Sequence, residues 1–300
     1  MRKYSLVLVA VLGIWSCKNE KKAPKIGDDN GITEITYTTD PSNELLNKNT
    51  DALLDIIETK QGELKQKLSK IKTKEEGDAL FSEYYKSFSS IMDSLNIAES
   101  STLKNYAKWS DNQKPDSVLL KEKRFTELDI FVKHRDSNHF ELKFTPGYYH
   151  RLFKNKVSND LQDYLELIGN TNRLNYNIQI KNQEYSMVEY RKIALQWEDY
   201  LLKHKNSPQK EVALRYYQEV IKNYLFGRIY KSNVDWETKK LTTIAEPELM
   251  KFIKDQPKTQ TAKITKEFLQ FFYSTQQTTS NKDFYKRINE LVSEQITKSF

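Results

Sequence analysis

The chain has 300 residues, enough for one or two domains with a sizeable core. Its 8 Gly and 7 Pro leave little room for the frequent tight turns of a sandwich or barrel, and the Gly residues never cluster as a phosphate-binding loop requires. A single Cys excludes an intrachain disulfide framework and an all-thiolate zinc site, and four His exclude a His-rich metal centre.

The first residues have the pattern of a secretory signal. Arg2 and Lys3 form a short basic start, and residues 6–15 form an apolar run. Ten residues of helix rise about 15 Å, half of the hydrocarbon core of a bilayer, so this run is too short for a permanent span. The sequence therefore predicts a signal peptide over residues 1–16, directly before Cys17.

Residues 14–17, Ile-Trp-Ser-Cys, resemble the lipobox of bacterial lipoproteins, although Trp15 departs from the small or aliphatic residue usual at its place. The resemblance implies cleavage before Cys17, a thioether-linked diacylglycerol on its sulfur, and an acyl group such as palmitate on the new amine. An ordinary signal peptide with a stray Cys is the alternative. We favour the lipoprotein because the single Cys of the chain stands at the position that this chemistry needs.

The residue after Cys17 bears on where such a lipoprotein resides. In the well-known sorting pattern, Asp at that position retains a lipoprotein in the inner membrane, and Lys18 therefore resembles the outer-membrane case. The resemblance implies a protein of the bacterial cell envelope, lipid-anchored in the outer membrane and facing the periplasm or the surface. The polar tract 18–22 is also consistent with a surface-export tether, and this alternative stays open.

The charge of the mature chain is modest. Removal of residues 1–16 leaves a net charge of +5, and the basic residues of the whole chain are 39 Lys and 9 Arg. Recognition of phosphates and base edges favours Arg. We therefore interpret the excess of Lys as a solvated surface and expect no nucleic-acid partner.

The composition changes near residue 45. Residues 17–44 are polar and show no helical period, which predicts a lipidated Cys followed by a flexible tether. Residues 45–300 predict a predominantly helical domain, with a subdivision near 110–146 left open. The residues of the tether that break regular structure are Pro24, Gly27, Gly31 and Pro41.

Two helices are predicted at the start of this domain, because apolar residues recur at helical steps in two stretches. We expect Gly77 to separate them, and the helices to pair antiparallel with their apolar faces in contact. The first stripe consists of Leu53, Ile57, Leu64, Leu68 and Ile71, and the second of Phe81, Tyr84, Tyr85, Phe88, Met92 and Leu95.

The middle of the chain departs from the helical pattern. Residues 128–132 and 140–144 alternate at period two on either side of Asp136-Ser137-Asn138, which predicts a β-hairpin near 127–145. An isolated hairpin is only marginally stable in water, so we expect this one to pack on helices.

Helical periodicity then resumes and continues nearly to the end, with predicted helices near 161–168, 187–201, 213–225, 248–255 and 261–274 and a last one up to 296. Small and polar residues are expected to begin or end these helices. They are Gly169 and Gly227 as helix ends, Ser207 as an N-cap followed by Pro208, and Ser280 as the cap of the last helix.

Residues 189–226 loosely resemble one tetratricopeptide-like unit. Trp197, Tyr200, Ala213 and Tyr217 fall near the aromatic and small positions of such units, but the interhelical Gly is absent and no similar unit recurs elsewhere. The resemblance implies only that two helices pack as a hairpin. The predicted fold class is mainly α: an irregular helical bundle or a short helical-repeat array, with one β-hairpin insertion near 127–145.

Three of the four His are the first candidates for a metal site. His134 and His139 flank the predicted turn with Asp136 and Glu141 nearby, and such residue types bind zinc and other transition metals. His150 belongs to the following helix. Because the turn is expected to be exposed, we favour solvent-facing polar residues and predict no metal and no cofactor.

No catalytic residue can be assigned from the sequence. Ser101 and Lys104 have the Ser-x-x-Lys spacing, but the Lys-Thr-Gly partner of penicillin-binding proteins is absent. The 41 acidic residues make candidate acid pairs too numerous to choose among.

Tyr residues crowd one third of the chain. Because Tyr216 and Tyr217 cannot both lie at the centre of one helical stripe, we expect some rings and hydroxyls to reach the surface or a groove, where they suit carbohydrate, peptide and protein contacts. Partial burial in a Tyr-rich core is the alternative, which we favour. The residues are Tyr148, Tyr149, Tyr185, Tyr190, Tyr200, Tyr216, Tyr217, Tyr224 and Tyr230.

Two function classes follow from these features. The leading hypothesis is a lipid-anchored envelope protein that binds or scaffolds an envelope protein, a peptide or a glycan without catalysis. The rival is an envelope hydrolase whose acidic residues come together only in the fold. A deep cleft with two inward carboxylates or a His–Asp pair would favour the enzyme, and a shallow aromatic surface would favour binding.

Overall fold

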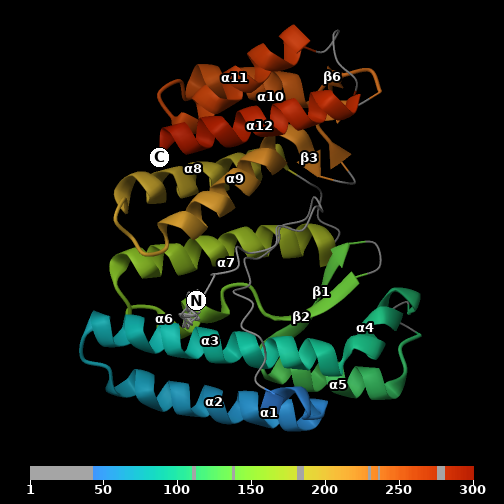
Figure 1. Ribbon diagram of the computed structural model, residues 1–300, viewed down its shortest axis with the longest axis vertical. Helices are drawn as coiled ribbons and strands as arrows, with labels where there is room; N and C mark the ends of the chain where they lie inside the picture. The colour runs from blue at the N-terminus through green and yellow to red at the C-terminus, as the bar shows by residue number, and fades with distance from the viewer. Residues whose placement is uncertain are drawn as a thin grey trace, which may run out of the picture.

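The computed structural model describes residues 43–109, 113–136, 139–180, 186–228, 231–235, 237–275 and 281–300. These residues are mainly helical with a β-hairpin inserted among the helices, so the predicted fold class is confirmed. The N-terminal helices of the described chain lie at one end of the long axis of the molecule and the C-terminal helices at the other (Figure 1).

The first part of the described chain is a layer of helices joined to the hairpin. The second and third helices lie side by side as the predicted antiparallel pair, with Leu53, Ile57 and Phe88 fully buried. In chain order the elements are α1 (Asn43–Leu46), α2 (Thr50–Lys70), α3 (Lys74–Ala98), α4 (Ser100–Asn105), the 3-10 turn η1 (Tyr106–Lys108), α5 (Asp116–Glu127), β1 (Ile130–Asp136), β2 (His139–Phe144), α6 (Tyr148–Phe153) and α7 (Asn159–Ile180).

Gly77 does not separate α2 from α3, and this prediction is wrong. Helix α3 begins at Lys74, so Gly77 lies in its first turn. Thr73 and Glu76 form a capping box, in which the Thr73 side chain accepts from the Glu76 N–H and the Glu76 carboxylate accepts from the Thr73 N–H. The missing Cβ of Gly77 serves a different purpose, because it lets the backbone of Lys156 approach α3 closely.

The hairpin predicted from period-two alternation is confirmed. Strands β1 and β2 pair antiparallel with Val132 opposite Leu142, and the register shifts between His134 and Asp136 beside the turn. Leu142 is fully buried and part of the hydrophobic core. The hairpin therefore packs on helices, as an isolated pair of strands could not be stable alone.

The second part of the described chain is a stack of long helices with two short strand pairs. The helical hairpin implied by the tetratricopeptide-like resemblance is present as two adjacent helices, and Gly227 ends the second of them with a φ of +81°, a conformation that favours glycine. The elements are α8 (Met187–Lys203), α9 (Lys210–Phe226), β3 (Gly227–Arg228), β4 (Lys231–Ser232), β5 (Val234–Asp235), β6 (Lys240–Leu241), α10 (Ala245–Asp255), α11 (Gln260–Thr275) and α12 (Asn281–Ser299).

Two further predicted helix boundaries are wrong, and Ser280 lies outside the described residues. Helix α7 continues through Gly169 and does not end there. The residue is small because it packs closely on Gly147, whose Cα would lie only 3.0 Å from a Cβ at position 169. Helix α9 begins at Lys210, three residues after Ser207, whose Oγ accepts instead from the Gln209 N–H at 3.2 Å in a turn before the helix.

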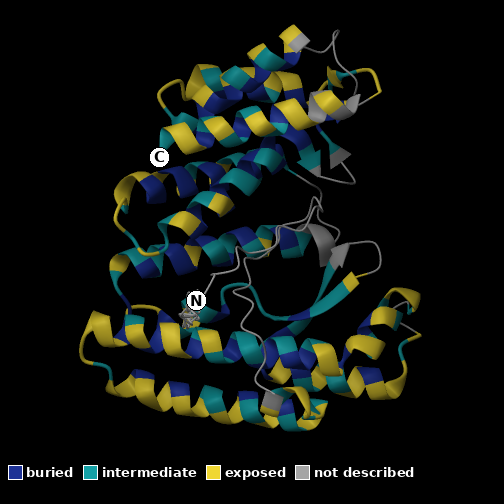
Figure 2. Cartoon of the chain, in the orientation of Figure 1, coloured by how far each residue is buried: buried dark blue, intermediate teal, exposed yellow. Residues whose placement is uncertain are grey.

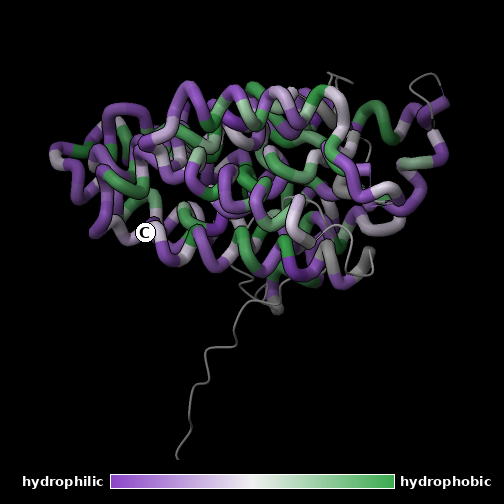
Figure 3. The backbone as a smooth tube through the Cα atoms, turned by 90° about the horizontal axis from the view of Figure 1, so that it is seen from above, coloured by the Kyte–Doolittle hydropathy of each residue, from purple (hydrophilic) through white to green (hydrophobic). Residues whose placement is uncertain are grey.

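One continuous cluster of buried apolar residues extends from Leu53 in α2 to Ile296 in α12. Figure 2 shows buried residues concentrated between neighbouring helices and exposed residues on the outward faces. Seen along its long axis the molecule is wider than it is thick, and hydrophilic residues follow much of its outline (Figure 3). Helices of 4 to 25 residues with an inserted hairpin make an irregular stack rather than a regular repeat array.

Candidate functional site

The β-hairpin is held between helices α3 and α7. On one side, Asn96 of α3 bonds the backbone of Leu142: its Nδ2 donates to the carbonyl at 3.1 Å and its Oδ1 accepts from the N–H at 2.7 Å. The Asn96 amide thus satisfies the backbone N–H and C=O of Leu142 at the edge of β2 that does not pair with β1. On the other side, Phe131 of β1 meets Tyr176 of α7 edge to face, with ring centroids 4.9 Å apart. These contacts fix one edge of the hairpin on α3 and the Phe131 face on α7.

The face of the hairpin that carries Phe131 also carries three charged side chains, Lys133, Glu141 and Lys143, and we name it the charged face. Glu141 contacts Lys133 Nζ at 3.5 Å with one oxygen and Lys143 Nζ at 3.7 Å with the other. The three side chains are only 15% to 23% exposed. Half-buried charges are costly unless they are paired, and here one carboxylate serves two ammonium groups.

A fourth ionisable group, Asp93 of α3, lies within electrostatic reach of the charged face. The pKa of Asp93 lies above its usual range, mainly because the side chain is buried. The Lys143 ammonium lowers this pKa and the Glu141 carboxylate raises it, but burial is the largest effect. Ionisable groups with pKa values perturbed by burial and by specific charges gather at functional sites. The charged face, together with Asp93, is therefore the candidate site of this protein.

The His residues singled out from the sequence do not come together. Residues adjacent in a strand point to opposite faces, so His139 lies on the face opposite to Phe140, and it is exposed. His134 lies across from Phe140, is half-buried and stacks on its ring at a centroid distance of 4.6 Å, so the expectation of a solvent-facing side chain is wrong for this residue. His150 is half-buried in α6. Among the residues that the structure describes, no three His, Cys, Asp or Glu are grouped to hold a metal ion.

Ser101 and Lys104 both lie in α4, a helix of six residues. Both side chains are exposed, and the Ser101 carbonyl accepts a hydrogen bond from Asn105 Nδ2 at 2.9 Å within the same turn. A Ser–Lys mechanism needs a lysine enclosed in a desolvating pocket, and this exposed pair on a short helix is not enclosed.

The expectation that some Tyr rings of the crowded segment reach a groove is wrong for the pair on which it rested. Tyr216 and Tyr217 are 4% and 0% exposed. Tyr216 stacks on Trp197 of α8 with ring centroids 5.3 Å apart, and the Tyr217 hydroxyl lies 3.0 Å from Thr261 Oγ1 of α11. The Tyr-rich core is therefore the correct alternative for this pair. Tyr148, Tyr190, Tyr200 and Tyr224 are also buried, Tyr149 is half-buried, and Tyr185 and Tyr230 lie outside the described residues.

Sequence reasoning missed a polar cluster where the turn between α8 and α9 meets the start of α7. One oxygen of Asp163 contacts both His204 Nε2 and Lys203 Nζ, each at 2.8 Å. Ser207 Oγ donates to Asp160 Oδ2 at 2.9 Å. The two Asp residues are three positions apart in the first turns of α7, and this spacing on one helix face was the available signal.

A Ser, a His and two Asp in one cluster resemble the parts of a nucleophilic site, but their connections differ. In a nucleophile–base pair the hydroxyl donates to the base, usually an imidazole. Here the Ser207 hydroxyl donates to Asp160 and also lies 2.9 Å from the Tyr200 hydroxyl. Burial raises the pKa of Asp160 and of Asp163, but the hydrogen bonds that they accept outweigh it and hold both pKa values below their usual range. Both groups are ionised acceptors that join α7 to the α8–α9 turn.

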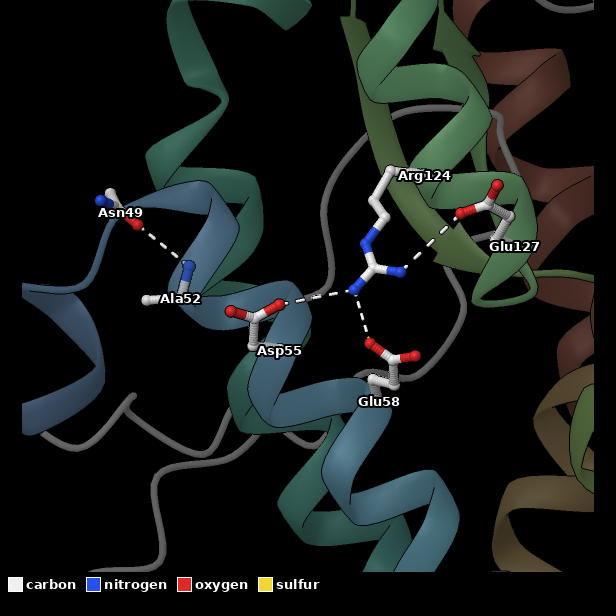
Figure 4. A network of polar contacts seen from close by, with 6 residues as sticks. All are labelled: Asn49, Ala52, Asp55, Glu58, Arg124 and Glu127. Carbon is white, nitrogen blue, oxygen red and sulfur yellow. Dashed lines mark hydrogen bonds and ion pairs between the residues drawn. The ribbon is translucent and has the colours of Figure 1, made fainter.

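Another ionic group joins α2 to α5 on the surface (Figure 4). Arg124 Nη2 contacts Glu58 Oε2 at 2.5 Å and Asp55 Oδ1 at 3.4 Å, and Nη1 lies 3.8 Å from Glu127 Oε2. All three carboxylates are more than half exposed, so solvent screens them and each pair adds little stability. This group positions two helices and is not a reactive centre.

The predicted lipid attachment site, Cys17, lies outside the described residues. Of the helices that the structure describes, none combines the length and the hydrophobicity needed to cross a membrane. Comparison of the chain with protein-family models, with curated proteins and with solved structures finds no match.

Proposed function

We propose that the chain is a lipid-anchored protein of the bacterial cell envelope that binds a partner through the charged face of its hairpin. The anchoring rests on the pattern of residues 14–17 with Cys17 as the acceptor and on Lys18 for the outer membrane. The binding role rests on one observation, the three half-buried charges Lys133, Glu141 and Lys143 on a strand pair held between two helices.

The chemistry of the charged face favours one of the partner classes expected from the sequence. Two ammonium groups and two carboxylates, those of Glu141 and Asp93, complement a ligand that itself carries both signs of charge. A peptide or a protein segment has that property, and a neutral glycan does not. The proposed partner is therefore a charged peptide segment of another envelope protein.

A binding role is also supported by what the other polar clusters do. The Asp163–His204 pair and the Ser207–Asp160 pair connect helices, and the buried Glu198 caps one. An envelope hydrolase, the rival function, needs a nucleophile or an acid–base pair directed at a substrate. The Asp163–His204 pair, the Ser207–Asp160 pair and Glu198 instead make hydrogen bonds that join helices of the fold.

The anchor predicts a change in location when its acceptor is removed. We expect Cys17→Ala to move the protein from the membrane fraction to the soluble fraction, because the thioether-linked lipid supplies most of the membrane affinity. Fractionation of cell envelopes and the intact mass of the purified wild-type chain measure this. An unmodified sulfhydryl on the mature wild type, or equal retention of both proteins in the membrane, contradicts the anchor.

The binding role predicts a partner that depends on the charged face. A photo-reactive residue in place of the exposed His139, beside this face, is expected to crosslink one reproducible envelope protein in intact cells. Lys133→Gln combined with Lys143→Gln should lower the yield at least about fivefold, since each removes a desolvated charge contact. Lys251→Gln on the exposed side of α10 is the matched control and should leave the yield unchanged. Turnover of an envelope substrate without a crosslinked partner would favour the hydrolase.

A further inference from the structure

We propose that the surface formed by α4, η1 and α5 as far as Arg124 docks on the membrane that carries the lipid anchor, with an anionic lipid surface as its ligand. We name it the docking edge and define it as residues 100–109 and 113–124. The inference rests on the proposed anchoring at Cys17 and names a second contact of the protein with the same bilayer.

The docking edge presents apolar side chains to solvent. Val118 and Phe125 of α5 are buried, whereas Leu119 and Leu120 are 43% and 68% exposed. One exposed Leu needs no explanation, but here two consecutive Leu side chains are exposed on a helix whose other face is already packed, and polar and charged residues surround them on α5. A lipid surface is the partner that takes up isolated apolar side chains beside charged ones without requiring a shaped pocket.

Aromatic residues adjoin this helix. Tyr106 and Trp109 follow α4, are half-buried, and lie with ring centroids 6.0 Å apart. Lys114, just before α5, places its Nζ 4.8 Å from the centre of the Tyr106 ring and connects the two parts of the docking edge. Trp and Tyr are enriched where proteins meet the membrane–water interface, because their rings are apolar and their tips are polar.

The charge of the docking edge fits an anionic surface. Its exposed charged residues within the described ranges are Lys104, Lys108 and Lys123 against a single acid, Asp116. Lysine extends its ammonium group toward lipid phosphates while its methylene stem covers apolar surface. Basic residues beside exposed apolar side chains are typical of helices that lie in the headgroup region.

A buried carboxylate places the docking edge next to the start of the fold. Glu99, at the junction of α3 and α4, accepts from Thr50 Oγ1 at the start of α2 and from Lys121 Nζ of α5 at 2.6 Å. The start of α2 therefore lies close to Lys121 of α5. Figure 1 shows α1, α4 and α5 in the same lower part of the molecule.

The length of the segment between Cys17 and the first described helix keeps the docking edge close to the bilayer. Twenty-five residues separate Cys17 from Asn43, and they span at most about 90 Å. A lipid on Cys17 keeps the docking edge at a high effective concentration near the bilayer, so a contact that is weak alone becomes significant. One lipid signal and one surface signal together give stable membrane binding.

The test separates docking from lipidation by removing the lipid. The chain from residue 17 onward with Cys17→Ala contains every described residue and is mixed with vesicles of phosphatidylethanolamine and phosphatidylglycerol, or of phosphatidylcholine alone. We expect co-sedimentation with the anionic vesicles at millimolar lipid that weakens as salt is added. Leu119→Ser combined with Leu120→Ser should lower the partition coefficient at least about tenfold.

Leu202→Ser is the matched control, since Leu202 is a similarly exposed residue at 44% but lies on α8. It should change vesicle binding by less than about twofold, and circular dichroism should show the same fold for all variants. No binding of the unlipidated chain to anionic vesicles, or equal binding of the double variant, overturns the inference. The inference is also overturned if the double Leu variant binds vesicles as the parent does but no longer crosslinks to an envelope protein, because the occupant of the docking edge is then a protein. The intact mass of the wild type tests the anchor separately, so the two proposals can fail independently.

Discussion

Gly77→Ala is expected to lower the free energy of unfolding by about 2–4 kcal/mol. A Cβ placed on Gly77 would lie 1.8 Å from the carbonyl oxygen of Lys156 and 2.8 Å from its carbonyl carbon. The atoms in the way are backbone, and this backbone is held by a hydrogen bond from the Lys156 N–H to the Phe153 carbonyl at 2.8 Å and by the fully buried Val157 beside it. The start of α3 must therefore move away from the loop after α6.

Gly62→Ala is the matched control for this variant. Gly62 lies within α2, and a Cβ there would meet nothing within 4 Å. Alanine is a better helix former than glycine, so this change should raise the stability by about 0.5–1 kcal/mol. Urea unfolding followed by circular dichroism measures both variants. Helix propensity alone predicts the same sign for both, so a stabilising Gly77→Ala would refute the close contact.

Gly77 also shows why the start of α3 was predicted at the wrong residue. Gly77 is typical of a break when only local propensity is considered, because glycine weakens a helix interior. The start of α3 was nevertheless visible in the sequence as a capping box, since Thr73 is followed three residues later by Glu76. The approach of Lys156 could not be foreseen, because it is a contact between segments about eighty residues apart.

The burial of Tyr216 and Tyr217 illustrates a second limit. The sequence argument assumed that α9 buries a single face, as a surface helix does. In the fold α9 is covered by α8 on one side and by α11 and α12 on another, so neighbouring residues both find partners: Trp197 for Tyr216, and Thr261 with Phe300 for Tyr217. Periodicity reveals which residues share a face but not how many faces are covered.

Part of the candidate site could be predicted from the sequence, namely the hairpin that carries it. Period-two alternation predicted the hairpin, and the same alternation places Lys133 across from Glu141 once the register is known. The register shift beside the turn decides which residues pair, and it is set by the turn geometry. Which face packs on the core depends on α3 and α7, and no local pattern indicates these neighbours.

Glu198→Ala is expected to destabilise the fold by about 2–4 kcal/mol, the second large effect. Glu198 is a buried carboxylate on α8 that acts as the cap of another helix. Its Oε1 accepts from the Gln260 N–H at 2.7 Å, and its Oε2 accepts from the N–H and the hydroxyl of Thr261 at 2.8 and 2.7 Å. Removing it takes the acceptor away from the backbone N–H groups of Gln260 and of the fully buried Thr261, and an unsatisfied buried donor costs about 1–3 kcal/mol.

Two variants separate this capping role from a general effect of losing charge. Glu198→Gln retains one acceptor oxygen but presents an amide N–H₂ where Thr261 needs an acceptor, so its loss of stability should be intermediate. Glu189→Ala removes a surface carboxylate of the same helix, paired with Lys192 at 2.8 Å, and should cost less than about 0.5 kcal/mol.

Amide hydrogen exchange locates the effect. The N-terminus of α11 loses its acceptors in Glu198→Ala, so the amides of Gln260 and Thr261 should exchange faster, beyond the increase that the lower global stability causes. A carboxylate also interacts favourably with the positive end of a helix, which adds to the loss. If exchange at these two amides rises no more than elsewhere in α11, or if Glu198→Ala and Glu189→Ala are equally mild, the connection between α8 and α11 does not depend on this carboxylate.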